Sequence, residues 1–161
     1  MNMKKLFKIC SMIQTLMPDT ENIIKSKSLY IIQTYHLLLY DIPAFEETIE
    51  AWMYGPSVEK AVSFFKFPEI CDYSDLSEEL KKIITNVCNN LKNVDSHSLV
   101  WYMMNLETYK KHWISNKKYK YDAANYVIPI EEIKKYHKKI YEETGSYFPH
   151  LKEFKEVNIG S

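Results

Sequence analysis

The pattern of apolar and polar residues predicts a mainly helical chain. Apolar side chains recur at three- and four-residue spacing in several segments, as on the inner face of an amphipathic helix. One run, residues 29–40, is apolar nearly all round, which is typical of a helix that is covered on several sides. The predicted helices are residues 3–17, a central helix from Glu21 or Lys27 to Tyr40, residues 56–65, a helix capped by Ser77 and ending at Leu91, one capped by Asp95 or Ser96 and running through Leu106, and residues 130–144.

Short extended segments interrupt this helical pattern. We expect an extended or two-stranded element near residues 45–54 and 125–129, and an irregular segment over residues 114–127. Gly145 is placed to end the last helix, since glycine adopts a left-handed conformation easily. The expected fold class is therefore all-α, with about six helices. A single domain would span residues 1–145, and residues 146–161 would form a partly loose tail.

The stretch at residues 50–56 is the most distinctive. Trp52 and Tyr54 are large enough to anchor a core, because a buried aromatic side chain removes roughly 150–250 Å² from solvent. Gly55 can take a positive φ, and Pro56 suits the first position of a helix. The stretch therefore predicts an aromatic anchor, a corner and a helix start. The alternative interpretation is an ordinary turn beside a core tryptophan.

The chain resembles the Panacea antitoxin domain, the SocA/GepA-like family of phage-associated and toxin–antitoxin proteins. The resemblance rests on a leucine- and tyrosine-rich helix at residues 28–40, followed by Ala51-Trp52-Met53-Tyr54-Gly55-Pro56. It continues in Leu106-Glu107-Thr108-Tyr109 with Trp113, where Tyr109 stands at the family's histidine. The resemblance implies a structural motif of Ala51, Trp52, Gly55, Pro56 and Trp113. It also implies an antitoxin that acts on a toxin protein.

Charge narrows the range of partners. The chain of 161 residues has no net charge, and lysine supplies all of its positive side chains. Non-specific nucleic-acid binding is therefore not expected to be the main role, and arginine, the preferred reader of guanine, is absent. Residues 41–79 are rich in acidic side chains, and residues 110–139 are rich in lysine. These two segments are either solvated faces or a bipolar surface that steers a charged protein partner.

Ordinary signs of catalysis and of cofactor binding are missing. The five histidines are scattered, and none lies three or four residues from another histidine or a cysteine, so we expect no metal. With three glycines, the chain has no phosphate-binding glycine loop, and it has no Gly-x-Ser-x-Gly motif. His36 is expected to be a satisfied core histidine. The widely spaced Cys10, Cys71 and Cys88 suggest thiols in a reducing cytoplasm, and no apolar run is long enough to span a membrane.

The expected function is a non-catalytic protein-binding module that resembles a Panacea-type antitoxin and neutralises a toxin by direct contact, without a cofactor. One alternative is a phage or mobile-element protein that binds nucleic acid through its Lys/Tyr-rich segment. Another is an unrecognised hydrolase whose site forms only in space. The surplus of tyrosine favours an interface, because amphipathic aromatic side chains are enriched there. The expected partner-binding residues are Glu46, Glu47, Glu50, Tyr54, Tyr109, Lys117, Tyr119 and Tyr121.

Overall fold

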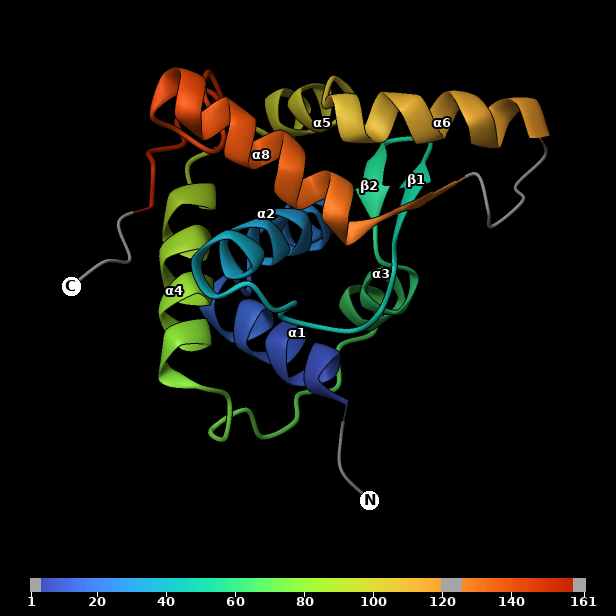
Figure 1. Ribbon diagram of the computed structural model, residues 1–161. Coiled ribbons are helices and arrows are strands. Elements are labelled where there is room, and N and C mark those ends of the chain that lie inside the picture. Colours follow the sequence, from blue (N-terminus) through green and yellow to red (C-terminus); the bar gives the residue numbers. More distant parts are fainter. Residues whose placement is uncertain (1–3, 120–125, 158–161) are drawn as a thin grey trace.

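The long helix α2 (Asn22–Tyr40) lies at the centre of the protein, as Figure 1 shows for the computed structural model. The structure describes residues 4–119 and 126–157, with side chains described up to residue 113 in the first range. Every residue of α2 from Ile24 to Leu37 is buried. The prediction of a central helix covered on several sides is confirmed.

Helices on several sides cover α2. Helix α1 (Lys5–Leu16), α3 (Glu59–Lys66) and α4 (Glu78–Leu91) form one part of this cover. Helices α5 (Ser96–Met104) and α8 (Ile130–Thr144) form the other part, and α6 (Glu107–Tyr119) follows α5 in one row and packs against α8 (Figure 1). The buried apolar side chains join in one cluster, and the mainly helical fold class is confirmed. None of the described helices is long and apolar enough to cross a bilayer.

A small antiparallel sheet stands between α6 and α3 (Figure 1). It consists of β1 (Ile49–Trp52), β2 (Gly55–Ser57) and β3 (Val127–Ile128), in the order β2-β1-β3. The expected extended segments are therefore present. The prediction that Pro56 begins a helix is wrong, because Pro56 pairs with Ala51 in the sheet and α3 begins only at Glu59.

Local capping signals are confirmed in the structure. The Ser77 hydroxyl accepts a hydrogen bond from the Leu80 amide at 3.1 Å, and Asp95 accepts one from the Ser98 amide at 3.0 Å. Each bond satisfies an amide that has no partner within its helix. Gly145 follows α8 with φ 80°, which is the left-handed conformation expected there. These helix ends follow from nearby residues alone.

Two features of the second half differ from the sequence interpretation. Helix α5 ends at Met104, and a separate helix, α6, begins at Glu107, so seven helices are present among the described residues. The prediction of an irregular segment is wrong for residues 114–119, which continue α6. Apolar periodicity is weak in this lysine-rich segment, and α6 is held through its first turns, which pack against β1 and α8.

The residues after α8 also contribute to the core. Phe148, Leu151 and Val157 are buried. His137 on α8 is fully buried, and the Tyr30 hydroxyl lies 2.8 Å from the His137 Nε2 atom. Its Nδ1 atom donates to the Tyr147 carbonyl at 2.9 Å, so Nε2 accepts from Tyr30 in the neutral ring. The C-terminal segment is therefore tied to the central helix.

Candidate protein-binding site

The β1–β2 hairpin is held from two sides by side chains of neighbouring helices. From α2, the Lys27 ammonium donates to the Pro56 carbonyl at 3.0 Å and to the Ser57 hydroxyl at 2.9 Å. From α6, the Tyr109 hydroxyl donates to the carbonyls of Trp52 and Met53, the latter at 3.2 Å. Both helices thus fix backbone atoms of the hairpin, and its turn is held in one place.

Gly55 allows this close packing. Its φ of 112° lies in a region that side chains with a Cβ atom rarely adopt and that glycine can take. A Cβ atom at this position would lie 3.3 Å from Met103 Cβ and 3.6 Å from the Lys27 ammonium nitrogen. Glycine is therefore required both for the backbone path and for space.

The hairpin presents its aromatic side chains outward rather than to the core. Ile49 and Ala51 are buried in β1, so by strand alternation Glu50 and Trp52 lie on the opposite face and are half-buried. The Trp52 indole nitrogen accordingly donates to Glu50 Oε1 at 2.9 Å. Tyr54 lies in the two-residue turn closed by the pairing of Trp52 with Gly55. The prediction that Trp52 and Tyr54 anchor the core is therefore wrong.

Two adjoining hollows lie beside this turn. The smaller, of about 360 Å³, lies between the start of α2, the hairpin and α3. The larger, of about 630 Å³, lies between the start of α2 and α5. Ile23 and Tyr54 line both hollows, so the two form one continuous surface.

We call this surface the hairpin surface. Its exposed side chains include Met53 and Tyr54, at 57% and 58% exposure, and Trp101 on α5, at 71%. Apolar side chains of this size remain in water at a cost of roughly 25 cal/mol for each Å² of apolar area. The residues that define the hairpin surface are Ile23, Trp52, Met53, Tyr54, Val100, Trp101 and Met104.

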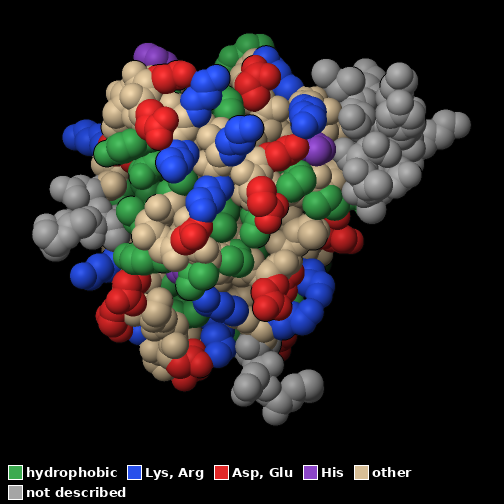
Figure 2. Space-filling view, viewed as in Figure 1, with side chains coloured by type: hydrophobic (Ala, Val, Ile, Leu, Met, Phe, Trp, Pro, Cys, Tyr) green, Lys and Arg blue, Asp and Glu red, His purple; other side chains and the backbone are tan. Residues whose placement is uncertain are grey.

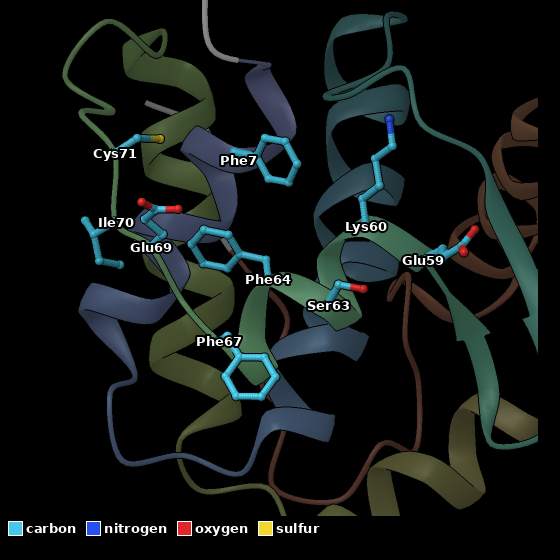
Figure 3. A pocket seen from close by; sticks show the side chains of 9 residues that line it. All are labelled: Phe7, Glu59, Lys60, Ser63, Phe64, Phe67, Glu69, Ile70 and Cys71. Carbon is cyan, nitrogen blue, oxygen red and sulfur yellow. The ribbon is translucent and has the colours of Figure 1, made fainter.

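A third hollow lies at the junction of α1, α3 and the segment that follows α3. Its volume is about 720 Å³, and Figure 3 shows the side chains of these elements that line it. Phe67 and Ile70 are 79% and 53% exposed on its rim. We call it the α3 hollow. Its lining includes Glu59, Lys60 and Glu69, so it carries more charge than the larger hollow of the hairpin surface.

The predicted partner-binding residues lie in different places. Tyr54 and Glu50 belong to the hairpin. Glu46 and Glu47 line a separate hollow near Lys4 and Lys5. Tyr109 is 1% exposed, and its hydroxyl donates to the hairpin backbone, so its contact with a partner stays a prediction that this burial does not favour. Its ring stacks on half-buried Trp113 at 6.2 Å between centroids, which places this motif residue in a structural role.

The lysine–tyrosine segment lies largely beyond the described side chains. Lys117 and Tyr119 belong to α6, but their side chains lie outside the described set, and Tyr121 lies outside the described residues.

Sequence reasoning missed Trp101, Met53 and Met104. One signal was available for α5: the run Trp101-Tyr102-Met103-Met104 is apolar on every face of a helix, so some of it must face outward.

Opposite charges are interspersed on the face in Figure 2. The acidic and basic segments meet where Lys134 forms an ion pair with Asp41, and within the lysine-rich segment Lys111 lies 3.0 Å from Glu132. His112 lies 2.6 Å from the other oxygen of Glu132. The two oppositely charged segments are therefore linked at the Lys134–Asp41 pair.

Burial favours the neutral forms of the core thiols and of His36. Burial raises the pKa of the Cys10 thiol well above its usual range and that of Cys88 to about 12. Burial lowers the pKa of His36, whose Nδ1 donates to the Ile42 carbonyl at 2.6 Å, so the satisfied core histidine is confirmed. Over residues 4–119 and 126–157, no three histidine, cysteine or acidic residues form a group that could hold a metal ion.

Together, these features define the class: a mainly helical protein whose distinctive surface is an exposed aromatic hairpin next to a hollow, a surface suited to another protein. The chain belongs to the family described as Antitoxin SocA-like, Panacea domain, which matches residues 26–114, over half of its length. This match includes the hairpin, α5 and the start of α6. The curated proteins and the solved structures contain no match to the chain.

Proposed function

We propose that this protein is an antitoxin that neutralises a toxin protein by direct contact through the hairpin surface. Family membership supports an antitoxin role and a protein partner in general. The observation that carries the proposal is the continuous apolar surface on which Met53, Tyr54 and Trp101 are each more than half exposed. Tryptophan, tyrosine and methionine are enriched in protein interfaces, and truncation of the first two often causes large losses of affinity.

The composition of the hairpin surface favours it over the α3 hollow. Interface cores are poor in charged residues and rich in aromatic residues and methionine. The two hollows of the hairpin surface are lined by Trp52, Trp101, Tyr54, Met53 and Met104, whereas neither tryptophan nor methionine lines the α3 hollow. The backbone of the hairpin is also fixed from α2 and α6, so little conformational freedom would be lost on binding.

The partner would meet this surface in the cytoplasm. Cys10, Cys71 and Cys88 are free thiols, which are typical of a reducing compartment. The interspersed charges around the hollows would affect mainly the association rate, while the aromatic contacts would set the dissociation rate.

Co-expression with the product of the adjacent reading frame tests the proposal. The wild-type protein should restore growth and co-purify with that product. The double substitution Tyr54→Ala and Trp101→Ala should weaken the complex by at least ~100-fold, since each hot-spot truncation costs about 2 kcal/mol or more. Both side chains are exposed, so the variant should fold normally.

Phe67→Ala provides the matched control, because Phe67 is an exposed aromatic residue of the α3 hollow. It should leave rescue and co-purification unchanged. Loss of binding in Phe67→Ala but not in the double variant would place the interface at the α3 hollow. If the adjacent product is harmless alone and does not co-purify with the wild type, the antitoxin role is refuted.

A further inference from the structure

Lys27 lines the smaller hollow, and its side chain is buried without an anionic partner among the described residues. Lys27 is 3% exposed, and its two hydrogen-bond acceptors are the Pro56 carbonyl and the Ser57 hydroxyl, both neutral. Within the described part of the chain, its third N–H has no acceptor and no ion pair includes it. The Ser57 hydroxyl donates to the Gly55 carbonyl at 3.3 Å, which leaves its oxygen to accept from Lys27.

Such an arrangement is unfavourable for an isolated protein. A buried ammonium group that lacks a counter-charge loses most of its hydration, and its charged form is disfavoured. Burial accordingly lowers the pKa of Lys27 to about 8. A carboxylate that entered the hollow would restore the missing interaction, because charge-assisted hydrogen bonds are the strongest polar contacts.

Lys25, two residues earlier on the same helix, provides an internal comparison. It is also 3% exposed, but its ammonium donates to Gln14 Oε1 at 2.7 Å and lies over the Phe65 ring at 5.9 Å. Lys25 does not line the hollow, whereas Lys27 does. The two buried lysines therefore differ in access to a ligand more than in burial.

We infer that the smaller hollow is a subsite for the side-chain carboxylate of an aspartate or glutamate in an apolar segment of the partner. The carboxylate accepts from Lys27, and Lys66 supplies a second positive charge to the same hollow. Trp52 and Val62 line it and contact the apolar part of the segment. This inference rests on the proposed function and adds the chemistry by which the partner is recognised.

The shape of the surface favours an internal acidic side chain over a chain end. Ile23 and Tyr54 connect the smaller hollow to the larger one beside Trp101. A segment that runs across both hollows can place a carboxylate on Lys27 and a neighbouring apolar side chain against Trp101. A C-terminal carboxylate in the smaller hollow would leave only one direction for the rest of the segment.

Blocked tripeptides test the subsite without a toxin. Acetyl-Leu-Glu-Trp-amide and acetyl-Leu-Gln-Trp-amide differ only in the side-chain charge, and each would be titrated into ¹⁵N-labelled protein while amide shifts are followed. The glutamate peptide should bind in the roughly millimolar range and at least ~10-fold more tightly than the glutamine peptide. The largest shifts should occur at Ile23, Tyr54 and Ser57.

Two variants and one further peptide complete the experiment. Lys27→Met should abolish the preference for the glutamate peptide, and Lys25→Met should preserve it. Acetyl-Leu-Gln-Trp with a free C-terminus should bind no more tightly than its amide. Equal binding of the two blocked peptides by the wild type, or no binding of either, would overturn the inference, and this comparison needs no variant to fold.

The outcomes also separate this inference from the proposed function. If the adjacent product co-purifies through Tyr54 and Trp101 but the peptides show no preference, only the acidic subsite is refuted. If the peptides show the preference but no toxin is bound, the antitoxin role is refuted and the subsite stands. A free-acid peptide that binds as tightly as the glutamate peptide would show a site for chain ends instead.

Discussion

Substitution of Gly55 by alanine tests how the hairpin is positioned. The backbone at Gly55 has φ 112°, and a residue held in a sparsely populated region costs about 1–3 kcal/mol. The added Cβ atom would lie 3.3 Å from Met103 Cβ, where Met103 is fully buried. Forcing an extra methyl group into a packed core costs typically about 1–3 kcal/mol. Alanine also restricts the unfolded chain, which returns about 0.4–1 kcal/mol.

The expected net loss is therefore about 2–4 kcal/mol in the free energy of unfolding for Gly55→Ala. Gly145→Ala is the matched control, because Gly145 has φ 80° but no atom within 4 Å of the added Cβ. A left-handed alanine costs about 1–2 kcal/mol, and the same gain from the unfolded chain reduces the net loss to about 1 kcal/mol.

Urea unfolding followed by circular dichroism measures both variants. With a slope of about 1–3 kcal/mol per molar urea, the two midpoints should differ clearly, and Gly55→Ala should have the lower one. A Gly55→Ala variant that is as stable as Gly145→Ala would refute the reasoning, because it would show that the backbone and Met103 relax around the new methyl group.

Four further substitutions test the same description. Tyr109→Phe removes the hydroxyl that holds the hairpin turn, and it should lower the free energy of unfolding by about 1–2 kcal/mol in urea. Trp52→Ala should cost less than the ~3–5 kcal/mol of a core tryptophan in the same assay, since the indole is half-buried. Burial lowers the pKa of Lys27 from 10.5 to about 8. Between pH 8 and pH 10.5, the unfolded chain therefore binds more protons at Lys27 than the folded protein does. Wild-type stability should therefore rise by about 3 kcal/mol relative to Lys27→Met as pH increases from 8 to 10.5. For His137, with its pKa lowered from 6.5 to about 4, wild-type stability should fall by about 3 kcal/mol relative to His137→Gln as pH decreases through that range.

For each of these four predictions, one outcome would contradict the reasoning. Unchanged stability of Tyr109→Phe would show that the turn needs no support from α6, and a core-sized loss for Trp52→Ala would place the indole inside. Parallel pH profiles for wild type and Lys27→Met would mean that Lys27 is hydrated. Parallel acid profiles for wild type and His137→Gln would mean that the buried ring is charged without penalty.

The features that the sequence predicted correctly depend on neighbouring residues. A serine or aspartate cap and a glycine after α8 act within a single turn, so Ser77, Asp95 and Gly145 were found without tertiary information. The burial of α2 follows in the same way from its continuous apolar run. At Gly55 the sequence indicated only that glycine before proline can take a positive φ.

The features that the sequence did not predict depend on distant contacts. Pro56 lies in a strand because Ala51 pairs with it, and Tyr109 is buried because the hairpin backbone accepts its hydroxyl. Trp52 points outward because it follows buried Ala51 in β1, and successive side chains of a strand lie on opposite faces. This position can be inferred only once the strand is assigned. The exposure of Trp101 depends on which face of α5 the core covers. The candidate site was therefore only partly visible in the sequence, through Tyr54.

Hydrogen–deuterium exchange of the protein, alone and in complex with its co-purified partner, tests the central claim most directly. Amides of residues 52–54 and 96–104 should become protected in the complex, while residues 63–71 at the α3 hollow should exchange at the same rate in both states. Protection at residues 63–71 with none at the hairpin would contradict the assignment of the hairpin surface as the protein-binding site.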